Sequence, residues 1–160
     1  MPTFTEIQRP RQSWLYLVIV ALAALGWGIF IQQIVRGKPI GDDPMPDSGA
    51  IVVWALLGLA LPLFFLWLKM ETTVYADRVE VRMKPFSHRV FRKRAISAYS
   101  AGEYRPLREF GGWGIRGWGA NRAYSISGNQ GVRLQLRDGN RVLIGTQRPQ
   151  ELAAAIEAMH

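Results

Sequence analysis

The chain has 160 residues, no cysteine and a formal net charge of +8 at pH 7. Without cysteine it forms neither disulfides nor thiolate metal sites. Residues 69–160 carry sixteen basic and eight acidic side chains, so the C-terminal part of the chain is the basic one. Nucleic acid, anionic lipid or an acidic protein would complement such a charge.

Two apolar segments, at residues 14–35 and 50–68, contain no charged side chain and follow an N-terminal tail of residues 1–13. As helices they would be about 33 Å and about 28 Å long, close to the ~30 Å hydrocarbon core of a bilayer. We predict two transmembrane helices, the second kinked at Pro62. A cleaved signal peptide fits less well, because the first run continues far beyond its small residues. A soluble core fits less well too, because a domain this small hardly covers two helices that are apolar on every side.

The connecting segment, residues 36–49, is short, acidic and rich in proline and glycine, whereas basic residues stand in the tail and directly after residue 68. The positive-inside rule therefore predicts both termini in the cytoplasm, although Arg36 and Lys38 act against this orientation. Neither apolar segment contains Asp, Glu, Lys, Arg or His, which indicates an anchor rather than an ion path. Ala24 and Gly28 form a small-xxx-small pair, which would let two copies of this helix approach closely in a homo-oligomer.

From residue 71 onward, apolar and charged residues alternate, most clearly at residues 79–84 and 132–137. A period of two predicts strands with one buried and one exposed face. Pro149 and the apolar stripe that follows it predict a C-terminal helix. For residues 69–160 we expect six or seven antiparallel strands in a small barrel or two-sheet sandwich, covered by that helix, so the whole chain would be an α+β membrane protein.

Three segments carry a resemblance: ETTVYADRVEVRMKPF from Glu71, YRPLREFGGWGIR from Tyr104, and GVRLQLRDGNRVLIGTQRPQELAAAI from Gly131. They resemble bacterial pleckstrin-homology-like membrane proteins, in which two spans precede the domain. The resemblance covers nearly the whole chain and implies a pleckstrin-homology-like cytoplasmic domain at the bacterial inner membrane. It implies no activity, because fold alone does not settle function. The tight connection around Asp77 and a C-terminal helix without tryptophan argue against specific phosphoinositide binding.

Residues 104–122 concentrate glycine, tryptophan and arginine. Gly112, Gly114 and Gly117 match G-x-G-x-x-G by spacing. A dinucleotide site also needs a strand before this motif and a helix after it, and the sequence indicates neither. The segment is then either a surface for a protein or the membrane interface, or a glycine-bent crossing whose aromatic rings fill the core. The candidate residues are Arg105, Arg108, Phe110, Trp113, Arg116, Trp118 and Arg122.

A second basic cluster consists of Arg89, Arg92, Lys93 and Arg94. Near a membrane, each would attract anionic lipid by about 1 kcal/mol. The alternative is a strand edge protected by charge against aggregation. Basic residues among aromatic ones also suit nucleic acid, which a membrane-tethered domain is less suited to bind.

Catalysis has little support in the sequence. The two histidines, His88 and His160, belong to no Ser/His/Asp set and to no H-E-x-x-H motif, so we expect no enzyme activity, no metal and no cofactor. The sequence predicts a membrane-anchored, non-catalytic interaction module that binds a protein partner or the anionic membrane surface. The alternative is a structural or assembly subunit of a larger membrane complex, with the two helices as the main contact.

Overall fold

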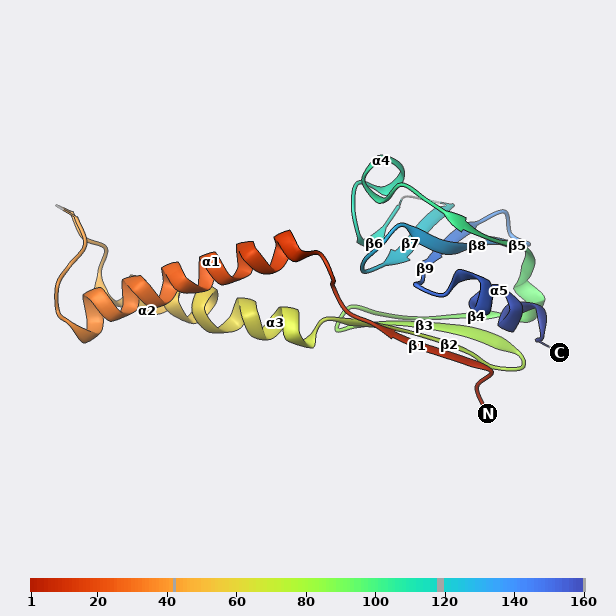
Figure 1. Cartoon of the computed structure of the whole chain (residues 1–160), viewed down its shortest axis with the longest axis horizontal. Helices are drawn as coiled ribbons and strands as arrows, with labels where there is room; N and C mark the ends of the chain where they lie inside the picture. The colour runs from red at the N-terminus through yellow and green to blue at the C-terminus, as the bar shows by residue number, and fades with distance from the viewer. Residues whose placement is uncertain (42, 118–119, 160) are drawn as a thin grey trace. The chain divides into compact units, whose positions relative to one another are not determined.

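The computed structural model describes residues 1–41, 43–117 and 120–159. The chain divides into a helical unit, Gln12–Trp67, and a sheet domain made of Met1–Arg11 together with the chain from Leu68 onward (Figure 1). The predicted α+β class is confirmed, as are two sheets followed by a C-terminal helix.

The helical unit contains two long apolar helices. The first consists of α1 (Ser13–Phe30) and the π-helical turn η1 (Ile31–Val35). The second consists of α2 (Asp47–Val53), the π-helical segment η2 (Trp54–Ala60) and α3 (Leu61–Trp67), and so begins before the predicted residue 50. By length and composition alone, both are able to cross a membrane.

The two helices approach each other closely at a pair of glycines. A Cβ atom on Gly26 would lie 3.2 Å from the backbone nitrogen of Gly58, and one on Gly58 would lie 3.2 Å from the Trp27 ring, so a larger residue at either position would require its neighbours to shift. Pro62 has no N–H with which to give the Gly58 carbonyl an α-helical hydrogen bond. The indole Nε1 of Trp27 donates to that carbonyl instead, at 3.3 Å. The neighbouring helix thus satisfies the group that proline leaves open.

The first sheet of the sheet domain is antiparallel, in the order β1-β2-β3-β4. Its strands are β1 (Phe4–Gln8), β2 (Lys69–Val74), β3 (Arg78–Lys84) and β4 (Ser87–Arg92). The sequence predicts only a tail over residues 1–13, whereas the structure places β1 there and pairs Phe4 with Val74 and Gln8 with Met70. No apolar alternation announces this strand, because two of its buried positions hold Glu6 and Gln8.

Hydrogen bonds hold β1 against residues 145–147, which lie near the other end of the chain. Glu6 is 8% exposed, and its carboxylate accepts hydrogen bonds from the Thr146 hydroxyl and from the backbone nitrogen of Gln147, the latter at 2.9 Å. The Gln8 amide donates to the carbonyl of Gly145 at 2.9 Å. A buried carboxylate is tolerated when it is hydrogen-bonded in this way. The N-terminal residues are therefore part of the domain.

The second sheet has the order β5-β8-β9-β7-β6. Its strands are β5 (Ile96–Glu103), β6 (Gly114–Arg116), β7 (Asn121–Ser125), β8 (Gln130–Leu136) and β9 (Arg141–Gly145). The fully antiparallel expectation is wrong for one pair, since β7 and β9 run parallel. The reason is that β9 returns from β8 into the position between β8 and β7. Over the described residues the two sheets hold four and five strands and do not close into a barrel. Eight of these strands lie after residue 68, where six or seven were expected.

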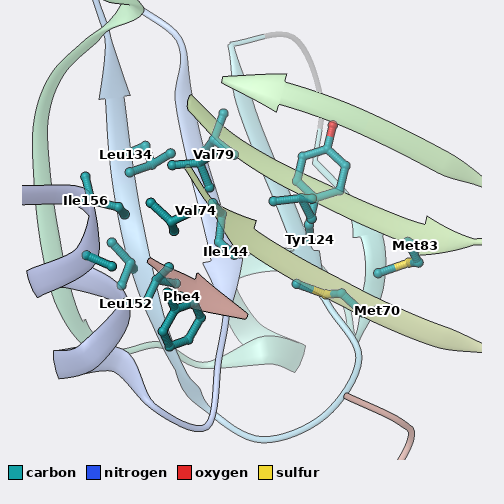
Figure 2. Close-up of a cluster of buried hydrophobic side chains, with 14 of the residues drawn as sticks. Phe4, Met70, Val74, Val79, Met83, Tyr124, Leu134, Ile144, Leu152 and Ile156 are labelled. Atoms are coloured by element: carbon teal, nitrogen blue, oxygen red, sulfur yellow. The ribbon is translucent and has the colours of Figure 1, made fainter. Parts of the chain in front are cut away.

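Three short helices complete the domain: η3 (Lys93–Ala95), α4 (Pro106–Phe110) and the C-terminal α5 (Pro149–Glu157). Helix α5 lies between the sheets and contacts strands of both (Figure 1). Apolar side chains from the two sheets and from α5 meet in one core, among them Val79, Leu134, Ile144 and Leu152 (Figure 2). The η3 turn carries the chain from β4, an edge of the first sheet, to β5, an edge of the second.

Candidate functional site

Two candidate aromatic residues of segment 104–122, Phe110 and Trp113, make contacts within the fold. Phe110 packs on the buried cluster of Tyr104, Ala123 and Leu143, with its ring centroid 6.2 Å from that of Tyr104. Trp113 is half-buried, and its Nε1 donates a hydrogen bond of 2.8 Å to the carbonyl of Gly128. Both rings therefore support the domain. Trp118, also named as a candidate, lies outside the described residues.

The arginines of this segment are dispersed. The Arg116 Nε donates to the carbonyl of Trp113 at 3.1 Å, which ties it to its own turn. Arg105, Arg108 and Arg122 are exposed and stand on different elements: Arg105 before α4, Arg108 within α4 and Arg122 in β7. The segment presents exposed charge without gathering it at one place.

Glu109 links α4 to the second sheet. Its carboxylate accepts one hydrogen bond from the backbone nitrogen of Arg105 at 2.8 Å and one from the Arg133 guanidinium at 2.7 Å. The Arg105 hydrogen bond, followed by the charge of Arg133, holds the pKa of Glu109 below its ordinary value. Sequence inspection gives Glu109 an arginine neighbour but does not reveal that its main ion-pair partner is Arg133 of β8.

The second predicted cluster lines a large groove, which we call the arginine groove. It has a volume of about 1470 Å³ and runs along the corner of β4, η3 and β5, beside the C-terminal end of α5. The predicted residues Arg89, Arg92, Lys93 and Arg94 all line it. The structure adds Arg78 from β3 and Arg137, the residue directly after β8. These two were missed because only strand pairing brings them to the corner.

Four of these side chains are available to a ligand. Over the described residues, no carboxylate forms an ion pair with the four groove arginines, which are Arg89, Arg92, Arg94 and Arg137. The other two basic groups are engaged: Arg78 pairs with Asp77 and Glu80, and the Lys93 ammonium donates to the carbonyl of Met159. The Arg78 hydrogen bond is the main reason that the pKa of Glu80 is lowered.

The wall of the arginine groove is apolar as well as basic, and it also includes two carboxylates, Glu157 and Asp77, the latter paired with Arg78. Phe91, Ile96, Leu136, Ile156 and Met159 line it and also belong to the domain core or pack against it. Guanidinium groups bind carboxylates and phosphates through two parallel hydrogen bonds, which makes arginine well suited to either group. The groove thus combines anion-binding groups with a fixed apolar wall.

A second groove, of about 740 Å³, borders the same strand. It is lined by Arg122, Arg133 and Arg141 from three strands, with Glu109 and Phe110 contributed by α4. Ala98 and Tyr99 of β5 line both grooves, so β5 stands between two surfaces that carry arginine. Sequence reasoning does not find this groove, because its arginines lie far apart in the chain.

Comparison with known proteins gives a family and no activity. A search of curated proteins finds no match. Over the described residues, no group of three His, Asp or Glu side chains is placed to hold a metal ion. A family model described as a family of unknown function (DUF6141) matches residues 2–159, nearly the whole chain, and the protein therefore belongs to that family.

Proposed function

We propose that this protein is a membrane-anchored, non-catalytic binding module whose pleckstrin-homology-like sheet domain holds an anionic group in the arginine groove. That group is a carboxylate of a protein partner or a phosphate of the membrane surface. The observation that carries the proposal is the convergence of Arg92 from β4, Arg94 from η3 and Arg137, the residue directly after β8, over an apolar wall. Exposed guanidinium groups gathered in one groove form an anion site.

Anchoring is supported by the helical unit and by the strands that flank it. Both helices expose apolar side chains along their length, including Leu17, Val20, Leu59 and Leu63. The strands that flank the two helices in the chain are β1, which ends at Gln8, and β2, which begins at Lys69, and they pair with each other. A hairpin that crosses a bilayer twice leaves its two ends on one side. The pairing of β1 with β2 requires both strands to be on the same side of the membrane. The basic residues near those ends favour the cytoplasmic side of a bacterial inner membrane.

A likeness to the pleckstrin-homology fold is supported by the order of the elements. An antiparallel sheet that contains β2, β3 and β4 is followed by a second sheet and then by α5, which packs between them. The strand β6, the parallel β7–β9 pair and the N-terminal β1 are additions to the simple pattern. The hairpin between β2 and β3 spans only residues 75–77, too few to form a phosphate-binding loop. Binding at the β4–η3–β5 corner is therefore the more favourable arrangement for this chain.

The assembly-subunit alternative has one observation in its favour. Ala24 and Gly28 are exposed on α1, and a Cβ atom on Gly28 would meet no atom within 4 Å. Another helix could approach this face closely. A Gly28→Leu substitution separates the two functions. If the protein is chiefly an assembly subunit, this variant loses its complex, and the loss does not depend on anion binding in the groove.

The test uses the full chain in nanodiscs of neutral lipid, because β1 belongs to the domain and a truncated domain would lack a strand. The groove variant is Arg92→Gln with Arg94→Gln and Arg137→Gln. The loop variant, Arg105→Gln with Arg108→Gln and Arg116→Gln, removes the same charge elsewhere. Binding is measured to vesicles that contain phosphatidylglycerol and to a glutamate-rich peptide.

We expect the groove variant to bind at least one probe about tenfold more weakly, a loss of about 1.4 kcal/mol, and the loop variant to stay within about twofold. Equal losses in the two variants would mean that total charge, and not the groove, governs binding. Absence of binding to both probes by the unmodified protein would refute the proposal.

A further inference from the structure

The outer edge of β5 is the feature of the domain that the anion-binding proposal leaves unused. Strand β5 is the first strand of its sheet and pairs only with β8 over the described residues. Residues 98–103 keep regular register with β8, after a bulge between Ile96 and Ala98. In an antiparallel edge strand, alternate residues direct their N–H and C=O groups away from the neighbour. The edge of β5 therefore offers a row of main-chain donors and acceptors.

The two edge strands at this corner differ in how they are protected. Strand β4 reads SHRVFR, and its positive charges oppose pairing with another strand. Strand β5 reads ISAYSAGE and is longer, with small uncharged residues over most of its length. Ser97, Ala98, Tyr99 and Ser100 are all exposed. Edge charges of the kind that protect β4 are missing from these four residues of β5.

The surroundings of β5 define what could pair with it. Side chains of an added strand would alternate between the two faces of the sheet. Because Ala98 and Tyr99 line both the arginine groove and the second groove, successive side chains would enter one groove and then the other. The first of these grooves, the arginine groove, is lined by Arg92, Arg94 and Arg137. The second groove is lined by Arg122 and Arg141. Both rows of side chains on the added strand would therefore meet arginine, which outnumbers the carboxylates Asp77 and Glu157 of the first groove and Glu109 of the second.

We infer that β5 accepts an extended acidic segment of a partner protein, which adds a strand to the second sheet and places its carboxylates in the two grooves. This inference rests on the proposed function and specifies its ligand. Main-chain hydrogen bonds to β5 would supply affinity, and the arginines on either side would select glutamate- or aspartate-rich sequences.

Other occupants fit the same features less well. A second copy of the chain, paired edge to edge through β5, would bring four arginine-lined grooves together, and like charges would oppose the contact. A lipid headgroup would use the arginines but has no main chain to pair with the strand. An acidic extended peptide uses both the edge and the charge.

The test separates strand pairing from charge. One probe is a fluorescent peptide of glutamate and valine of the same length as β5. The control peptide has the same sequence, with alternate backbone nitrogens methylated so that one edge of the peptide can no longer donate hydrogen bonds. A third peptide is methylated on the other alternate nitrogens, which blocks its opposite edge. All three carry the same charge. Binding to the full chain in neutral nanodiscs is measured by fluorescence anisotropy, for the unmodified protein and for the groove variant.

We expect the unmodified peptide to bind, and one methylated peptide to bind at least about tenfold more weakly than the other. The groove variant should weaken binding of the unmodified peptide. If all three peptides bind equally while the groove variant still weakens them, the anion site stands and strand addition is refuted. If none of the peptides binds and phosphatidylglycerol vesicles do, the ligand is a lipid phosphate and this inference is wrong. If neither peptides nor vesicles bind, the proposed function fails as well.

Discussion

Two arginine-bearing regions of the sheet domain look alike in sequence and differ in what their side chains contact. In residues 104–122, Phe110 covers a buried cluster, Trp113 donates to a strand turn, and Arg116 bonds to the carbonyl of Trp113. In residues 89–99, the arginines converge on a groove, where Arg92 and Arg94 have no described ion-pair partner. The rings of Phe110 and Trp113 in the first region support the fold and its exposed arginines stand apart, whereas the arginines of the second region gather in one groove. Composition alone does not distinguish these two outcomes.

The largest expected effect tests whether the first region is structural. A Cβ atom on Gly117 would lie 2.1 Å from the carbonyl oxygen of Asn121, and the residue has φ +101°. Gly117→Ala should therefore destabilise the second sheet by about 3 kcal/mol or more, because backbone atoms have nowhere to move. Hydrogen exchange of amides in β7 and β9 measures this loss.

The matched control is Gly111→Ala in the same segment. Gly111 also has a positive φ, +69°, but a Cβ atom there would meet nothing within 4 Å. Its cost should be about 1 kcal/mol, the conformational penalty alone. Similar exchange rates in the two variants would show that the close approach at Gly117 is not a constraint on the fold.

A second substitution in the same region sharpens the comparison at an aromatic residue. Phe110→Ala removes a half-buried ring from the cluster of Tyr104 and Leu143 and should cost about 2 kcal/mol, below the value for a fully buried ring. Leu107→Ala, one turn earlier in α4, should change stability by less than about 0.5 kcal/mol, because Leu107 is 70% exposed. If Phe110 instead behaves like Leu107, and its loss weakens ligand binding, residues 104–122 would be the binding surface.

The arginine groove should respond in the opposite way. Replacing Arg92, Arg94 and Arg137 by glutamine should leave the unfolding free energy of the domain within about 0.5 kcal/mol per site, because exposed charges contribute little to stability. Thermal unfolding of the full chain in detergent, read at the domain by hydrogen exchange, measures this. A large loss would mean that these arginines hold the corner together.

The smallest effect concerns pH. The pKa of Glu109 is lower in the folded chain than its ordinary value of 4.5, chiefly through the Arg105 backbone hydrogen bond and then through Arg133. A lowered folded pKa gives stability that is fully present above the unfolded pKa and is lost as the pH falls through the folded one. Protection of the α4 region should therefore decrease below about pH 4.5 in the unmodified protein. In Glu109→Gln, that decrease should be absent, whereas an unchanged pH profile would remove Glu109 as its cause.

Sequence reasoning predicts the parts of this molecule that have a local signal. Apolar length indicates the two helices, and alternation indicates β3 and β8. Strand β1 is not predicted, because its buried Glu6 depends on hydrogen bonds from Thr146 and Gln147, which are far away in the chain. The parallel β7–β9 pair is not predicted for the same reason, since pairing depends on where β9 inserts.

The candidate site shows the same division between local and distant information. Arg89, Arg92, Lys93 and Arg94 lie close together in sequence and form a visible cluster. Arg137 joins them only because Leu136 pairs with Ile96 at the start of β5. Whether a tryptophan or arginine is engaged within the fold, as Trp113 is with Gly128, is equally a matter of distant contacts.

We propose that ligand binding is centred on the β4–η3–β5 corner and the edge of β5, and not on residues 104–117. Hydrogen–deuterium exchange of the full chain in neutral nanodiscs, with and without the glutamate–valine peptide, tests this most directly. We expect slower exchange on peptide binding at alternate amides of residues 96–103, with little change at residues 104–117. Protection confined to residues 104–117, with β5 exchanging as before, would contradict it.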